Sequence, residues 1–139
     1  MALATRRSAL AILVSALAAV ASRARAATSL DRDFIAAAFR MKDEAVRSGD
    51  EPYGAVVVKD GRIIGFGPSR VVLRADWTAH AEREAVRHAQ AHLGKADLSG
   101  CMMYSTSRPC AACERAAAEA KVARMYVGLD GMDAGAPRS

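Results

Sequence analysis

The sequence predicts an α/β protein in which three helices cover a mixed sheet of about four strands. Short apolar runs of strand length alternate with longer stretches whose apolar residues recur every three or four positions. Asp60-Gly61 separates the first two runs and is a favoured two-residue hairpin turn. Each later run follows an expected helix, so the strands after the hairpin should pair in parallel. With 139 residues, 52% of them hydrophobic, the chain can form one core.

The first helix is predicted from Ser29 to Ser48, where apolar residues form one face. Gly49 would end this helix, which is expected only to pack on the sheet. An unbroken apolar strand follows from Gly54 to Lys59, and an antiparallel strand returns from Arg62 to Gly67. The stretch from Val71 to Ala75 is ambiguous, with a loop as its first interpretation.

The second half of the chain alternates helix and strand. Thr78 is the expected cap of a helix that runs to His92 and stops at Gly94. Three elements follow: a strand at Met102–Ser105, a helix from Cys110 to about Lys121 started by Pro109, and a strand at Val122–Gly128. Residues 131–139 are rich in Gly, Ala and Pro and are expected to form a tail.

Residues 1–26 are typical of a cleavable export signal. Arg6-Arg7 precedes an uncharged run from Ser8 to Ser22, and Ala24-Arg25-Ala26 has the pattern of a cleavage site. The run is too short for a membrane span, which needs about 20 residues, and the arginine pair resembles a twin-arginine signal. We therefore expect export to the bacterial periplasm, by the twin-arginine or the general secretory route. The mature domain would be residues 27–139, without a membrane span.

The charge distribution argues against nucleic acid as a partner. The formal charge is +5, but residues 1–26 hold four arginines and no acid, which leaves 16 basic and 15 acidic side chains after them. A nearly neutral domain lacks the basic surface that binds a polyanion. The sequence therefore favours a small-molecule substrate.

One histidine, one glutamate and two cysteines form the candidate active site. His80 and Glu82 stand near the start of one expected helix, and Cys110 and Cys113 at the start of the next. One imidazole and two thiolates suit Zn²⁺ and leave its fourth position open for a water, which zinc activates near neutral pH. Glu82 is then placed to carry protons. Cys101 opens an apolar stretch and is expected in the core.

The spacing within each pair has a structural reason. Cys110 and Cys113 are three residues apart, so they lie on one face of a first helical turn, whose positive end favours thiolates. His80 and Glu82 are two residues apart, so they share a cavity only if their helix start faces it end-on. A cap at Thr78 would arrange this.

The two segments together resemble the cytidine and deoxycytidylate deaminase superfamily, and within it the guanine deaminase and tRNA adenosine deaminase branch. They read Asp76-Trp77-Thr78-Ala79-His80-Ala81-Glu82 and Thr106-Ser107-Arg108-Pro109-Cys110-Ala111-Ala112-Cys113. The resemblance runs from about Phe34 to Asp130 and includes Tyr53-Gly54-Ala55-Val56-Val57-Val58 as the family's first strand. It implies a cytidine deaminase-like α/β sandwich.

The resemblance also implies an activity, the zinc-dependent hydrolytic deamination of a nucleobase or nucleoside. His80, Cys110 and Cys113 would bind the zinc, and hydroxide on it would attack the amino-bearing ring carbon. Glu82 would protonate the ring nitrogen, take the proton of the water and pass it to the departing ammonia. Backbone groups around three residues would line the base pocket: Ala55, Ala81 and Pro109.

Three further expected substrate-binding positions depart from the pattern of this branch. Ser69 stands where an asparagine usually bonds the purine and offers a shorter group, and Arg108 replaces a glutamate. Trp77 stands where proline is common, and it would stack on a base or cover the pocket mouth. Family members continue further with a fifth strand and C-terminal helices, so a C-terminally shortened sheet of four strands and a more open pocket are expected.

Two other functions stay open. The first is a zinc-binding domain of this fold with weak or no catalytic activity, and the second is an exported thiol oxidoreductase that uses Cys110 and Cys113. A homodimer is also open, because relatives are commonly dimers and the alanine-rich helix faces can pack against a copy.

Overall fold

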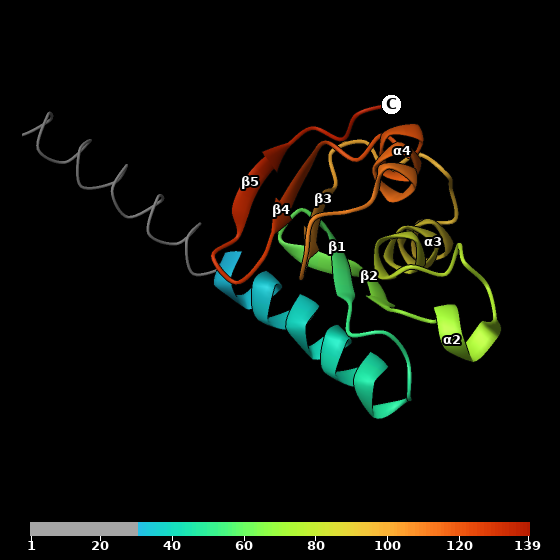
Figure 1. Ribbon diagram of the computed structural model, residues 1–139. Helices are drawn as coiled ribbons and strands as arrows, with labels where there is room; N and C mark the ends of the chain where they lie inside the picture. Colours follow the sequence, from blue (N-terminus) through green and yellow to red (C-terminus); the bar gives the residue numbers. More distant parts are fainter. Residues whose placement is uncertain (1–30) are drawn as a thin grey trace, which may run out of the picture. The chain divides into compact units, whose positions relative to one another are not determined.

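The computed structural model describes residues 31–139. The expected export signal and the first residues of the first expected helix lie outside this range. A helix at 31–47 comes first. The elements after it are β1 (Gly54–Lys59), β2 (Arg62–Pro68), α2 (Val71–Arg74), α3 (Ala81–Leu93), β3 (Met102–Ser105), α4 (Ala111–Glu119), β4 (Arg124–Val127) and β5 (Met132–Gly135) (Figure 1). Within residues 31–139, no helix combines the length and the apolar character that crossing a bilayer requires.

The sheet has five strands in the order β2-β1-β3-β4-β5. The hairpin is confirmed: β1 and β2 are antiparallel, and Asp60 and Gly61 have φ values of 49° and 76°, as a tight hairpin turn requires. Strands β3 and β4 are parallel, as expected. Strand β1 lies between β2 and β3 and is antiparallel to both, so β2 and β3 run in the same direction without pairing.

Two expectations about single elements are wrong, the C-terminal tail and the Thr78 cap, and the ambiguous stretch from Val71 is helical. The residues from Val71 on form the short helix α2, and the expected tail contributes a fifth strand, β5, paired antiparallel to β4. Both elements have four residues and are held by tertiary contacts: Leu73 N–H donates to Asp50 Oδ2 at 2.9 Å, and Arg124 forms an ion pair with Asp133 at 2.8 Å. Thr78 does not cap α3, because the capping position is His80.

Helices cover both faces of the sheet (Figure 1). One core joins α3 and α4 to one face and contains Cys101, which confirms its expected burial. The other core joins the 31–47 helix to the opposite face around Phe34 and Tyr104. On the α3 side, a Cβ on Gly67 of β2 would collide with the carbonyl oxygen of Ala81, so the start of α3 lies directly on the sheet.

The site lies at one edge of the sheet. Gly54 pairs with Pro68, Ala55 with Ser105, and Ser105 with Val127. The carboxyl ends of β2, β3 and β4 therefore meet the amino end of β1. The segments that lead into α3 and α4 both leave from this edge, as ligand sites in α/β sheets commonly do.

Candidate zinc centre and active-site pocket

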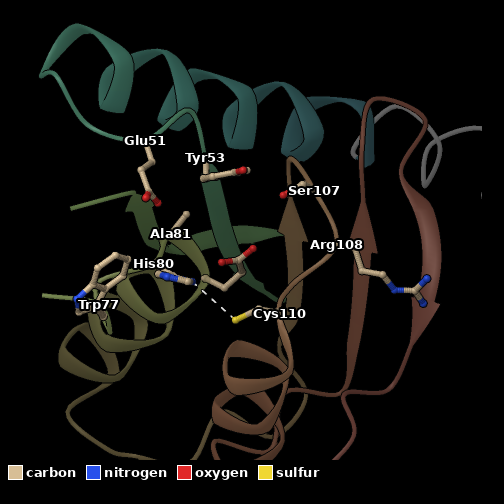
Figure 2. Close-up of a pocket in the computed structure, with 9 residues that line it drawn as sticks. Glu51, Tyr53, Trp77, His80, Ala81, Ser107, Arg108 and Cys110 are labelled. Carbon is tan, nitrogen blue, oxygen red and sulfur yellow. Dashed lines mark hydrogen bonds between the residues drawn. The ribbon is translucent and has the colours of Figure 1, made fainter. Parts of the chain in front are cut away.

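The three expected metal ligands converge. His80 Nδ1 lies 3.7 Å from Cys110 Sγ and 3.4 Å from Cys113 Sγ. The three ligand atoms lie within 4.8 Å of one another, although 33 residues separate His80 from Cys113. The dashed line in Figure 2 joins His80 to Cys110. They are the one group of metal-ligating side chains found in residues 31–139.

These distances suit zinc. Tetrahedral Zn²⁺ with Zn–S and Zn–N bonds of about 2.3 and 2.05 Å places a nitrogen about 3.6 Å from each sulfur. The two observed nitrogen–sulfur distances of 3.7 and 3.4 Å lie on either side of that value. Three protein ligands leave one tetrahedral position for water or substrate, the coordination of catalytic rather than structural zinc.

The three ligands stand at two helix starts, as predicted. Cys110 is the N-cap of α4, and its Sγ accepts a hydrogen bond from Cys113 N–H at 3.5 Å. His80 is the N-cap of α3, with an extended backbone at φ −61° and ψ 152° and no side-chain capping bond. The imidazole of His80 is therefore available for metal. Thr78 instead donates to Asp76 Oδ1 through its N–H and its hydroxyl, at 2.8 and 2.7 Å.

The electrostatics of Cys113 differ from the expectation. Burial, and then the negative charge of Glu82, raise the pKa of the Cys113 thiol in the metal-free protein, whereas the helix start alone was expected to favour the thiolate. Cys110 and Cys113 are both free thiols, and His80 Nδ1 lies 3.7 and 3.4 Å from their sulfurs. An imidazole that converges on both sulfurs favours metal binding over thiol oxidoreductase chemistry.

Glu82 lies beside the metal ligands and is held by a strand residue. Its side chain is buried, and Ser105 Oγ lies 2.8 Å from Glu82 Oε1. The same hydroxyl lies 2.8 Å from the carbonyl oxygen of Ser107. A hydroxyl has one proton to donate and lone pairs to accept with. Ser105 can therefore donate to the Glu82 carboxylate, or donate to Ser107 while accepting from a protonated Glu82.

A pocket of about 670 Å³ opens over this centre, within the range of small-molecule sites. It brings together residues from the loop before β1, the start of α3 and the segment before α4 (Figure 2). Its lining is Glu51, Tyr53, Trp77, His80, Ala81, Glu82, Ser107, Arg108 and Cys110.

The expected substrate-binding residues divide into two groups. Trp77, Ala81 and Arg108 line the pocket, with Trp77 82% exposed. The guanidinium of Arg108 points away from His80 and Cys110 (Figure 2).

The other three expected positions are buried and do not line the pocket. Ala55 and Pro109 are buried and outside it. Ser69 is fully buried, and its hydroxyl donates to Asp50 Oδ1 at 2.9 Å. The side chain of Ser69 is thus placed to hold Asp50 and does not line the pocket.

Sequence reasoning missed four residues of the site: Glu51, Tyr53, Ser105 and Ser107. Glu51 and Tyr53 precede β1, and Ser105 and Ser107 lie at the carboxyl end of β3. The available signal was the predicted strand pattern, because residues next to strand ends on one sheet edge become neighbours. That signal needs the strand order, which the chain alone does not provide.

The segment that carries Trp77 is braced by ion pairs. The buried carboxylate of Glu84 on α3 bonds Arg74 at 2.8 Å and Arg87 at 2.7 Å. Arg87 also donates to Thr78 Oγ1 at 2.8 Å. The loop between α2 and α3 is therefore fastened to the body of α3 on both sides of Trp77.

An α/β sandwich with a His/Cys/Cys centre at two helix starts defines a class of zinc-dependent hydrolytic proteins. The chain belongs to the cytidine and deoxycytidylate deaminase zinc-binding family, which it matches over residues 28–129. His80, Cys110 and Cys113 form the zinc-binding cluster of this family in the present chain.

The chain is similar to proteins whose names denote three different enzymes. Guanine deaminase of Bacillus subtilis is 37% identical over 102 residues, 73% of this chain and 65% of the relative. A tRNA-specific adenosine deaminase of Agrobacterium fabrum is 40% identical over 88 residues, 63% of this chain and 58% of the relative. A tRNA(Ile)-lysidine synthase of Deinococcus deserti is 45% identical over 67% of this chain and 18% of the relative. The chain thus spans less than two thirds of each relative.

Solved structures agree on the fold. The Bacillus subtilis guanine deaminase structure has a TM-score of 0.67 and 37% identity, covering 69% of this chain and 62% of that one. A tRNA:A34 deaminase structure has a TM-score of 0.67 and 36% identity, covering 69% and 70%. These matches confirm the predicted deaminase fold and place the chain near both groups of relatives.

Removal of the Ser105 hydroxyl tests its role in orienting Glu82. We expect Ser105→Ala to lower kcat about 10- to 100-fold for whichever base is the substrate, because a charge-assisted hydrogen bond of about 1.5–3 kcal/mol is lost. Zinc content should stay at one per chain. Steady-state ammonia release and metal analysis measure the two effects. Unchanged kcat would show that Glu82 is positioned without Ser105.

Proposed function

We propose that this protein is a zinc-dependent hydrolytic deaminase of a nucleobase or nucleoside, with guanine as the first candidate substrate. One observation carries the proposal: the carboxylate of Glu82 lines the same pocket as His80 and Cys110. A proton carrier, a metal centre and a substrate-sized space therefore coincide. The net reaction consumes one water, whose oxygen becomes a ring carbonyl, and releases the ring amino group as ammonia.

The residues of the chain have separate roles in this chemistry. A zinc ion held by His80, Cys110 and Cys113 supplies activation of water. Glu82 takes the proton that the water loses, protonates the ring nitrogen beside the reacting carbon and delivers a proton to the leaving amine. Ser105 keeps the Glu82 carboxylate in place through the 2.8 Å contact.

The pocket and the charge of the domain support a small substrate. Two carboxylates, Glu51 and Glu82, line the pocket, whereas the guanidinium of Arg108 points away from the metal ligands. The 16 basic and 15 acidic side chains after residue 26 nearly cancel. Both features disfavour a phosphate backbone, which proteins bind through clustered lysine and arginine.

The similarity to tRNA-specific adenosine deaminases supports a second candidate, an adenosine in tRNA. The two candidates differ in where they contact the protein. A free base fits inside the pocket, whereas a tRNA also needs contacts on the surface outside it. A salt dependence of activity separates them, because each phosphate contact steepens the loss of affinity with salt.

Ammonia release by the zinc-loaded protein tests the proposal. Guanine, adenine, cytosine, their nucleosides and a tRNA anticodon stem–loop would be assayed in parallel. We expect release from guanine at a kcat on the scale of ordinary enzymes, about 1–10³ s⁻¹, with little salt dependence. Release from none of them, by protein containing one zinc per chain, would favour an inactive zinc-binding domain.

A further inference from the structure

Glu51 is a pocket residue whose acidic group has no partner among the residues that the structure describes. Its side chain is half-buried and lines the active-site pocket from the loop before β1. In Figure 2 its carboxylate points into the space above Ala81 and His80. Within residues 31–139 the carboxylate makes no hydrogen bond or ion pair. A carboxylate that faces the pocket without a protein partner keeps its acceptor capacity for a bound ligand.

The backbone of Glu51 is held firmly, as a binding residue requires. Glu51 N–H donates to Asp50 Oδ1 at 2.8 Å, and the Glu51 carbonyl accepts from Tyr53 N–H at 2.8 Å. Asp50 is buried and is itself fixed by Ser69 Oγ and Leu73 N–H, each at 2.9 Å.

The Asp50 side chain remains charged in this role. Burial alone would raise the pKa of the Asp50 carboxyl, but the hydrogen bonds from Leu73, Glu51 and Ser69 outweigh it and hold that pKa below its ordinary value. Ser69 therefore acts on the pocket indirectly, by locking the residue that aims Glu51.

An ionised carboxylate only accepts hydrogen bonds, and this restricts the substrate. Guanine carries N–H donors in its ring, at N1 and, as the free base, at N9. An adenine or cytosine ring linked to ribose has no ring N–H, since its remaining ring nitrogens are acceptors. Facing such an acceptor, the Glu51 carboxylate would stay unpaired and also repel the lone pair.

We propose that Glu51 is a specificity-determining residue, whose carboxylate accepts a hydrogen bond from a ring N–H of a free guanine-type base. The proposal rests on the proposed deaminase function and deepens it, because it assigns the pocket residue that disfavours adenosine. Glu82 serves the reacting atoms, and Glu51 recognises the ring.

Substitution of Glu51 separates recognition from catalysis. Loss of a charge-assisted hydrogen bond should lower kcat/KM for guanine about tenfold in Glu51→Gln and about 100-fold in Glu51→Ala. Glu119→Gln, the same charge change on an exposed part of α4, should leave guanine turnover unchanged. All variants should keep one zinc per chain.

Methylated bases identify the donor. 1-Methylguanine lacks the N–H at N1, and 9-methylguanine lacks the one at N9. For the analogue without the N–H that contacts Glu51, wild-type protein should show a kcat/KM about 100-fold lower than for guanine. Glu51→Ala should lose that preference, as a double-mutant cycle requires of interacting partners. If Glu51→Ala keeps the wild-type preference for guanine over the methylated base and the wild-type kcat/KM for guanine, the role of Glu51 is refuted while the deaminase function stands.

Equilibrium binding keeps the inference testable without turnover. Guanine would be titrated into zinc-loaded Glu82→Gln protein and into the Glu51→Ala/Glu82→Gln double variant. We expect Kd to rise about 100-fold in the double variant. Equal Kd values would overturn the role of Glu51. Absence of guanine binding to either protein would overturn this role together with the choice of guanine as substrate.

Discussion

Glu82→Gln is expected to abolish ammonia release and to leave zinc in place. The amide has the size of the carboxylate and can still contact Ser105, which lies 2.8 Å away. It cannot take a proton from water or return one to the substrate. Proton transfer by a positioned side chain contributes about 10²–10⁴-fold to rate, and Glu82 serves more than one transfer. We therefore expect kcat to fall at least about 10³-fold.

The control for Glu82→Gln must show that the pocket is intact. Zinc content and the thermal unfolding midpoint should match wild type, because Glu82 is not among the three metal ligands. Guanine affinity should also persist, since the amide removes transition-state stabilisation more than ground-state binding. Substantial turnover by Glu82→Gln would refute its role as the proton carrier.

The chemical centre could be predicted from the sequence because its residue types and spacing are local features. His80, Cys110 and Cys113 each stand at a helix start, and a helix start is recognisable from Pro109 and from the apolar periodicity that follows. The burial of Cys101 followed from the apolar stretch that it opens.

The surroundings of the centre could not be predicted, because strand order creates them. Glu51 meets Glu82 in one pocket only because β1 inserts between β2 and β3. The buried hydroxyl of Ser69 donates to the carboxylate of Asp50, 19 residues away, and not to a group in the pocket. Such polar pairs leave no periodic pattern in the chain.

The two short elements were missed for a related reason. Helix α2 and strand β5 have four residues each, too few to show a helical or strand period. The Asp50 side chain holds the first, and pairing with β4 and the Arg124–Asp133 ion pair hold the second. Thr78 looked like a cap by residue type, but it bonds Asp76 instead, since the helix begins two residues later than expected.

Cys113→Ser is expected to remove zinc and the stability that zinc confers. The Cys113 side chain is 2% exposed, and its Sγ lies 3.4 Å from His80 Nδ1. A serine hydroxyl is shorter and is a much poorer zinc ligand than a thiolate. Metal analysis should fall from one zinc per chain to near zero. At free zinc 100-fold above the wild-type Kd, the free energy of unfolding should drop by about 2.7 kcal/mol through the lost linkage alone.

Cys101→Ser is the matched control for Cys113→Ser. Cys101 is also a buried thiol, fully enclosed in the α3–α4 core and outside the metal group. Burying its hydroxyl should cost about 1–3 kcal/mol, yet the variant should keep its zinc, and its unfolding midpoint should still fall when a chelator is added. The midpoint of Cys113→Ser should not respond to the chelator, because only a zinc-binding native state is stabilised by free zinc. A Cys113→Ser protein that retains stoichiometric zinc and responds to the chelator would place the metal elsewhere and refute the three-ligand centre.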